Sequence, residues 1–281
     1  MKPAGPVHVL DLFPPDREAL LSLLAELDDE AWARPTVCEG WTAKDVALHL
    51  LGDDIGLLSR RRDAFQDMSL ARGAGDLSAW ENLVAYLNRW NEAWVAAARR
   101  ISPSLLIDLL RFSGDQTQRY FESLDLEATG PPVSWAGSQP APVWLDVARE
   151  YTERWLHQQQ IRDAVERPGQ TEPRFLAPVL DTFVRALPHT FHDVLAPEDS
   201  HVRLTVSGDA GGVWSLVRHE AHWALYFDVE TEPVAAVAIG QDTAWRLFTK
   251  GLTREEALAT AELDGDRSLG LRVLSTVSII A

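Results

Sequence analysis

The sequence predicts an all-α domain over residues 1–169, followed by a smaller α+β domain over residues 170–281. In the first part, apolar residues recur every three or four positions, which is the spacing of amphipathic helices. In the second part, short apolar runs alternate with polar residues between Gly and Asp, as strands do. With 281 residues, 46% of them hydrophobic, the chain is long and apolar enough to fold two domains.

Five helices are expected in the first part. The second of them begins at Thr42, whose spacing to Asp45 is typical of a helix-capping box. Gly- or Pro-containing loops are expected over Ala71–Gly75 and Gly130–Pro142. The five helices are expected to run from Pro14 to about Pro35, Thr42 to about Gln66, Leu77–Ile101, Pro103 to about Leu124, and Val143–Val165.

The second part is predicted to begin with a helix over Pro173–Val194. Four short antiparallel strands follow, and then two short helices. The strands are expected at Val202–Val206, Val213–Val217, Trp223–Phe227 and Val234–Ile239, and the helices near Asp242–Thr249 and Asp266–Val277.

The charge of the chain disfavours several classes of partner. The formal net charge is −16, and a polyanion such as DNA is repelled by that field. The densest basic run, Arg60–Arg62, is flanked by Asp53, Asp54 and Asp63, so it is interpreted as a solvated helix face. No apolar run approaches the ~18–20 residues of a membrane span. We therefore expect neither a nucleic-acid nor a membrane partner.

The cysteine count and the first residues indicate a cytoplasmic protein. Cys38 is the only cysteine, so no internal disulfide can form. Residues 1–6 carry no apolar signal core. Cytoplasmic localisation is therefore expected.

One set of residues has the chemistry of a metal site. Glu153 and His157 are spaced i,i+4, so they share one face of the last long helix of the first part. His49 lies on another predicted helix of the same bundle. Two imidazoles and a carboxylate suit Zn²⁺ best, with Ni²⁺, Mn²⁺ and Fe²⁺ as alternatives. Three protein ligands leave a coordination position open, as in catalytic zinc sites.

The surrounding residues resemble a known family. Residues 27–50 contain a Cys-x-Gly-Trp-Thr motif from Cys38, then Asp45-Val46 and His49-Leu50. This segment resembles the N-terminal signature of the mycothiol-dependent maleylpyruvate isomerase family, within the DinB-like superfamily. The resemblance implies a DinB-like four-helix bundle in which His49, Glu153 and His157 are the metal ligands.

The resemblance extends to the C-terminal part. This part is similar to the sterol-carrier-like α+β domain of the family, and Ala261–Asp266 resembles a Gly-Asp turn near the end of that domain. The family often has Gly-Arg where this chain has Gly251-Leu252. Maleylpyruvate is therefore a doubtful substrate, and whether Arg246 or Arg254 replaces the arginine stays open.

The leading hypothesis is a thiol-dependent metalloenzyme. The open metal position would bind the sulfur of mycothiol or another small thiol, which would attack an electrophilic substrate in an isomerisation or S-transfer. The alternative is a non-catalytic protein that binds a structural metal and an apolar ligand. Hydrolysis by metal-activated water is a third hypothesis, with Glu153 as its only evident base. Substrate, thiol, metal and oligomeric state stay open.

Other candidate residues are given structural roles. The pairs His189/His192 and His219/His222 are interpreted as surface or structural histidines, because two ligands alone rarely hold a metal. The Cys38 thiol is interpreted as a packing group rather than a nucleophile.

Overall fold

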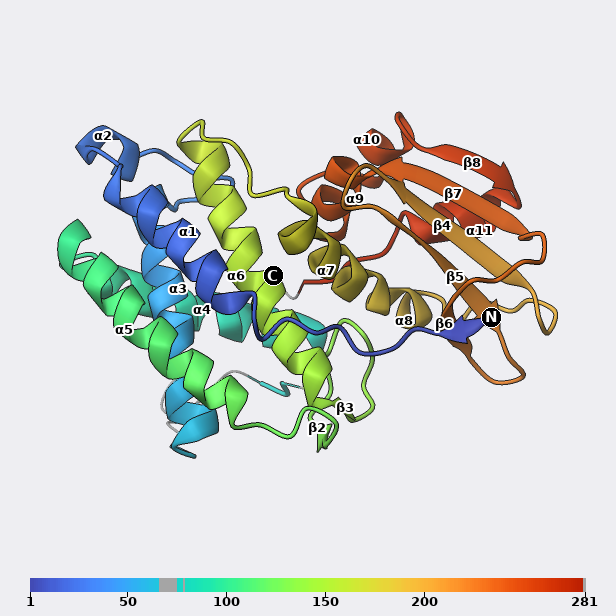
Figure 1. Ribbon diagram of the computed structural model, residues 1–281, viewed down its shortest axis with the longest axis horizontal. Coiled ribbons are helices and arrows are strands. Elements are labelled where there is room, and N and C mark those ends of the chain that lie inside the picture. The colour runs from blue at the N-terminus through green and yellow to red at the C-terminus, as the bar shows by residue number, and fades with distance from the viewer. Residues whose placement is uncertain (66–74, 78, 280–281) are drawn as a thin grey trace. The chain divides into compact units, whose positions relative to one another are not determined.

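The computed structural model describes residues 1–65, 75–77 and 79–279. Most of its helices lie before residue 200, and five of the six strands of its larger sheet lie after it (Figure 1), which confirms the predicted order of a helical part and an α+β part. The chain divides into two compact units. The helical unit comprises Val9–Asp125 and Glu153–Gly169, and the sheet unit comprises Met1–His8, Leu126–Thr152 and residues 170–279. The domain boundary between residues 169 and 170 stays a prediction.

The helical unit contains most of the predicted helices, but their first and last residues differ from the predicted ones. The first predicted helix is two helices, because the Asp28 side chain accepts the Ala31 N–H and so starts a second one. Thr42 and Asp45 form the predicted capping box at the start of the next. The helices are α1 (Phe13–Ala25), α2 (Asp29–Trp32), α3 (Ala43–Leu57), α4 (Trp80–Ala98), α5 (Pro103–Glu122) and the second part of α6 (Val143–Ala164).

A π-helical turn, η1 (Leu58–Arg62), continues α3. The predicted end of this helix near Gln66 lies outside the described residues, as does most of the predicted loop at Ala71–Gly75. The predicted loop at Gly130–Pro142 has a short strand at each end, β2 (Thr129–Gly130) and β3 (Ala141–Pro142), and these two strands pair with each other.

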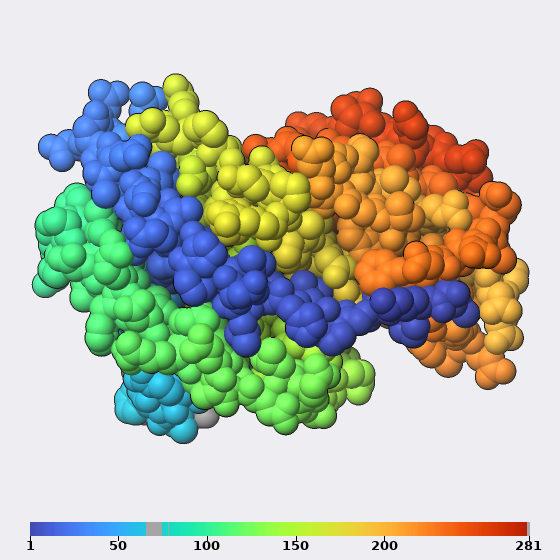
Figure 2. Space-filling view, viewed as in Figure 1, coloured from blue at the N-terminus to red at the C-terminus, as the bar shows by residue number. Residues whose placement is uncertain are grey.

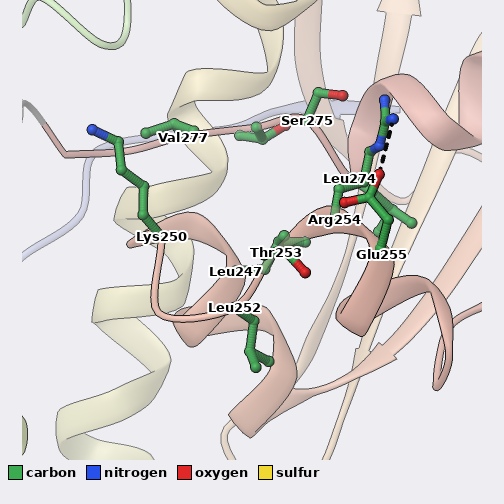
Figure 3. A pocket seen from close by; sticks show the side chains of 10 residues that line it. Leu247, Lys250, Leu252, Thr253, Arg254, Glu255, Leu274, Ser275 and Val277 are labelled. Atoms are coloured by element: carbon green, nitrogen blue, oxygen red, sulfur yellow. Dashed lines mark hydrogen bonds and ion pairs between the residues drawn. The ribbon is translucent and has the colours of Figure 1, made fainter. Parts of the chain in front are cut away.

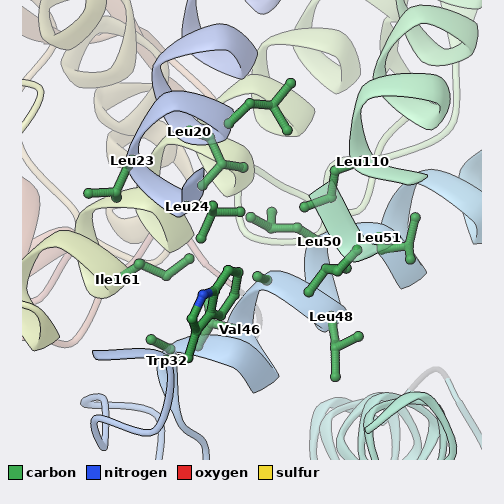
Figure 4. Close-up of a cluster of buried hydrophobic side chains, with 14 of the residues drawn as sticks. Leu20, Leu23, Leu24, Trp32, Val46, Leu48, Leu50, Leu51, Leu110 and Ile161 are labelled. Carbon is green, nitrogen blue, oxygen red and sulfur yellow. The ribbon is translucent and has the colours of Figure 1, made fainter. Parts of the chain in front are cut away.

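An apolar core joins the helices of the helical unit. Leucines of α1 and α3 meet Leu110 of α5 and Ile161 of α6 (Figure 4). Each fully buried side chain of this size contributes roughly 1.5–3 kcal/mol. Figure 2 shows α1 in blue and α5 in green lying side by side on one face of this unit. The burial pattern explains why these segments are helical, since their apolar stripes have partners.

A polar cluster is buried beside this core. The fully buried Asp54 carboxylate accepts hydrogen bonds from Arg17, Ser113 and Arg154. The nearby Asp16 carboxyl accepts a hydrogen bond from Gln158 at 3.1 Å. Burial raises the pKa of Asp16 from its ordinary value of 3.8 to about 7, although the neighbouring guanidiniums of Arg17, Arg154 and Arg162 and the Gln158 hydrogen bond act to lower it.

The six-stranded sheet contains the four predicted strands and two more. β4 (His201–Ser207), β5 (Gly212–Arg218) and β6 (Trp223–Phe227) form an antiparallel meander. β1 (Lys2–Pro3) pairs with β6, and β8 (Glu262–Gly265) pairs with β7 (Ala235–Gly240). The order across the sheet is β1-β6-β5-β4-β7-β8.

The prediction that all of these strands are antiparallel is wrong for one pair. β4 and β7 are parallel, because the chain returns from β6 to the far side of β4 before β7 begins. Arg203 of β4 fixes this connection by donating hydrogen bonds to the carbonyl oxygens of Val229 and Thr231. Residues 228–234 therefore form a crossover rather than a hairpin.

Helices cover the apolar face of the sheet. The helix predicted over Pro173–Val194 consists of three pieces: α7 (Pro173–Phe183), a 3₁₀ turn η2 (Val184–Ala186) and α8 (Leu187–Thr190). The interruption lies next to Pro188, which has no N–H to donate. α9 (Gln241–Phe248) and α11 (Arg267–Val273) contact β4 and β7, and α10 (Arg254–Leu258) follows α9. Among the described residues, no helix is long and apolar enough to cross a membrane.

We expect Asp16 to make stability depend on pH. Its folded-state pKa of about 7 exceeds the ordinary value of 3.8, so the folded protein binds the extra proton and its free energy of unfolding falls as pH rises through this window. Relative to Asp16→Asn, wild-type stability should fall by about 2–3 kcal/mol between pH 5 and pH 8. Urea denaturation of both proteins at the two pH values measures this difference, and identical pH profiles would contradict it.

Candidate metal centre

Two pairs of side chains meet between α3 and α6. His49 and Asp53 lie one turn apart on α3, and Glu153 and His157 lie one turn apart on α6. The capping box at Thr42 fixes the start of α3, and the leucines around His49 are buried in the core. The i,i+4 spacing places both members of each pair on the same face of their helix.

The distances between the donor atoms are short. His49 Nε2 lies 3.1 Å from His157 Nε2 and 3.3 Å from Asp53 Oδ2. Ligand atoms of these three residues all lie within 4.8 Å of one another. Glu153 Oε2 lies 3.8 Å from His157 Nε2. The structure therefore groups His49 and His157 with Asp53, and the predicted ligand Glu153 is not a member of this group although it lies beside His157.

These separations fit a shared metal ion. Two ligand atoms on one tetrahedral Zn²⁺, at about 2.0–2.1 Å each, are separated by about 3.3 Å. The His49–His157 and His49–Asp53 separations of 3.1 and 3.3 Å are close to this value. The donors are nitrogen and oxygen, the mixed set that suits zinc and its first-row neighbours. His49, His157 and one carboxylate could thus hold an ion, and a second carboxylate lies within reach.

Gln160 orients the ring of His157. Its Oε1 lies 2.7 Å from His157 Nδ1, and because this oxygen only accepts, Nδ1 carries the proton and Nε2 is left for the centre. The Cys38 Sγ also donates to Gln160 Oε1, at 3.3 Å. The thiol therefore contributes to the support of His157, which extends the packing role expected for Cys38.

The two imidazoles have opposite pKa shifts. Burial lowers the pKa of His49 well below its usual value, with the charges of His157 and Arg154 acting in the same direction. Burial also lowers the pKa of His157, but a hydrogen bond with Cys38 and the charges of Glu153, Cys38 and Asp53 outweigh it and raise the pKa to about 9. A metal ion held by both Nε2 atoms would need them free of protons, so metal and proton would compete for this position.

Tryptophans line this region in different ways. The Trp41 ring lies 5.2 Å from the His49 ring, measured between centroids, and its Nε1 donates to Glu92 at 2.9 Å. It therefore forms one wall beside His49. Trp155 is fully buried, in agreement with its position between Glu153 and His157 on another face of α6.

Asp53 was missed by the sequence interpretation, although a signal was available. Asp53 follows His49 at i+4, the same spacing as Glu153 and His157, but it was counted among the acids near Arg60–Arg62. Gln160 follows His157 at i+3, so this contact is also local in sequence, whereas the contact of Gln160 with Cys38 joins residues 122 positions apart.

The other histidine pairs form no such centre. The rings of His189 and His192 stack at 5.2 Å, and those of His219 and His222 do the same. Within the described residues, neither pair belongs to a group of three potential ligands. His219 instead hydrogen-bonds the Tyr226 hydroxyl at 2.9 Å.

The two arginines near Leu252 are each paired with a neighbouring carboxylate. An open groove of about 430 Å³ in the sheet unit is lined by Lys250, Leu252 and Arg254, among others (Figure 3). Arg254 pairs with Glu255 at 3.2 Å, and Arg246 pairs with Asp242 at 3.2 Å. Neither arginine occupies the position of Leu252.

A helical bundle with two histidine–carboxylate pairs on neighbouring helices, joined to an α+β unit, defines a class of helical proteins with a candidate metal centre. A family model described as the mycothiol maleylpyruvate isomerase N-terminal domain matches residues 13–162, which is more than half of the chain. The chain belongs to this family, as its sequence motif indicated.

Two solved structures are similar to the chain. They are the mycothiol-dependent maleylpyruvate isomerase and a histidine-to-alanine mutant of it. Each is 12% identical in sequence, with a TM-score of 0.48, over 85% of this chain and 86% of the other. No curated protein gives a significant match.

We expect the centre to lose its metal when either imidazole is removed. His49→Ala and His157→Ala each remove a nitrogen donor from a site with little redundancy, so purified protein should retain well under half of the wild-type metal. Elemental analysis measures this content. His192→Ala, in the sheet unit, is the matched control and should retain it. Full retention in both bundle variants would contradict the site.

Proposed function

We propose that the chain is a thiol-dependent metalloenzyme in which His49, His157 and Glu153 bind a divalent metal, with zinc favoured by the donor set. The observation that supports this proposal is the 3.1 Å separation of the Nε2 atoms of His49 and His157. The chain also belongs to a family whose name includes mycothiol. Asp53 is a second carboxylate available to the same ion. A small thiol such as mycothiol and an electrophilic substrate would be the reactants.

Zinc bound at this centre would act as a Lewis acid that favours the thiolate form of the cofactor. The residues of the chain orient the ligands and limit access to the metal. His49 and His157 are nearly buried, whereas the Asp53 side chain is 35% exposed, so the open side of the centre lies near Asp53. Gln160 holds the orientation of His157, and Trp41 excludes water from one side of His49.

The substrate is proposed to be a neutral electrophile. The family resemblance implies an arginine where this chain has Leu252, and Arg246 and Arg254 are each paired with a neighbouring carboxylate. A dicarboxylate therefore finds no pre-positioned guanidinium at Leu252. The net charge of −16 also disfavours the approach of an acidic molecule.

A non-catalytic metal-binding protein is the second candidate, and Asp53 favours it. If both Asp53 and Glu153 bind the ion together with the two histidines, four protein ligands fill a tetrahedral zinc site, as in structural centres. The position for a thiol would then be absent. The two functions differ in whether an added thiol can reach the metal.

The test is an activity assay on zinc-loaded protein with mycothiol. We expect conversion of a neutral electrophile such as a bimane at a rate at least tenfold above that of His157→Ala protein, and little isomerisation of maleylpyruvate. Product formation is followed by chromatography with and without the thiol.

Each other outcome has a definite meaning. Efficient turnover of maleylpyruvate would contradict the substrate argument and leave the thiol-dependent function intact. Metal-loaded protein that is inactive on both compounds, and whose metal is not reached by the thiol, would favour the binding protein.

A further inference from the structure

One buried ion pair joins the two helices of the candidate metal centre at the level of its carboxylates. Asp54 follows Asp53 on α3, and Arg154 follows Glu153 on α6. Arg154 Nη2 donates to Asp54 Oδ1 at 2.8 Å, and the side chains are 5% and 0% exposed. Successive helical residues point roughly 100° apart, so Asp53 and Glu153 can face the centre while Asp54 and Arg154 face the bundle interior.

The same carboxylate binds the other two helices that surround it. Asp54 Oδ2 accepts from Arg17 Nη2 of α1 at 2.8 Å and from Ser113 Oγ of α5 at 2.7 Å. These are the short distances of charge-assisted hydrogen bonds. Four helices, α1, α3, α5 and α6, therefore meet at one side chain.

The Asp54–Arg154 contact fixes the position of α3 against α6, which apolar packing alone leaves adjustable. The leucine contacts of the bundle are non-directional, so a small slide or rotation of α3 against α6 costs them little. Such a movement would separate His49 from His157. It would also stretch the Asp54–Arg154 hydrogen bond, and because the pair is shielded from water, no solvent molecule can replace the lost partner cheaply.

We propose that Asp54 is a positioning residue for the metal centre: through Arg154 it sets the register of α3 against α6 that holds the His49 and His157 nitrogens at a metal-binding separation. This inference rests on the proposed metal centre. It assigns to Asp54 a function in metal affinity that is separable from its contribution to folding.

The test measures zinc affinity and fold stability separately. Asp54→Asn keeps the shape of the side chain and removes its charge. In competition with a chromophoric chelator, on full-length protein well below its melting temperature, we expect its zinc Kd to rise 10–100-fold, as for other residues that support metal ligands. The Co²⁺ form should show altered d–d absorption, because the ligand geometry changes.

The matched control is Leu110→Ala, which removes an apolar side chain of α5 from the same bundle and keeps the backbone carbonyl that accepts from Arg17 and Ser113. We expect it to lower the melting temperature at least as much and to keep the zinc Kd within about 1.5-fold of wild type. Equal Kd values for Asp54→Asn and wild type, or equal weakening in Leu110→Ala, would overturn the inference.

Two further outcomes keep the test decisive. If Asp54→Asn does not fold, Ser113→Ala removes one hydrogen bond from the same carboxylate, and we expect its zinc Kd to rise about threefold; an unchanged Kd would overturn the inference. Wild-type protein that binds no zinc would refute the proposed centre itself, and the inference with it.

Discussion

The arrangement of the helical unit depends on a charge that it must keep out of water. Burying a carboxylate such as Asp54 is costly, and loss of one partner from a buried pair typically costs about 3–5 kcal/mol. The chain meets this cost with three donors, Arg17, Ser113 and Arg154, from three helices. Satisfying one side chain thus requires α1, α3, α5 and α6 to adopt one mutual arrangement.

The candidate centre follows from that arrangement and from helix periodicity. On α3, His49 and Asp53 face one way and Asp54 another; on α6, Glu153 and His157 face one way and Arg154 another. The two i,i+4 pairs therefore meet where the buried ion pair holds their helices. The resulting donor set is compact, largely buried and rich in nitrogen and oxygen, which is the chemistry that a borderline metal ion prefers. Membership of the mycothiol maleylpyruvate isomerase N-terminal domain family supports a thiol as the cofactor in the proposed function.

Local patterns predicted the fold class, and longer-range contacts explain what they missed. The periodicity of apolar residues indicated the helices and four strands, and the Thr42 capping box was visible as a motif. The parallel pairing of β4 with β7 depends on a crossover, and β1 is two residues that pair with a strand more than 200 positions away. In the site, spacing and resemblance indicated His49, Glu153 and His157. The contact of Cys38 with Gln160 and the contacts of Asp54 join distant segments that no local pattern relates.

The central claim is that two imidazoles and at least one carboxylate of the bundle bind one metal ion with room for a thiol. X-ray absorption at the zinc edge of the loaded protein tests it most directly. The account predicts a shell of nitrogen and oxygen at about 2.0–2.1 Å with imidazole scattering, and one sulfur at about 2.3 Å only after mycothiol is added. A spectrum without imidazole scattering, or with sulfur before any thiol is added, would contradict it.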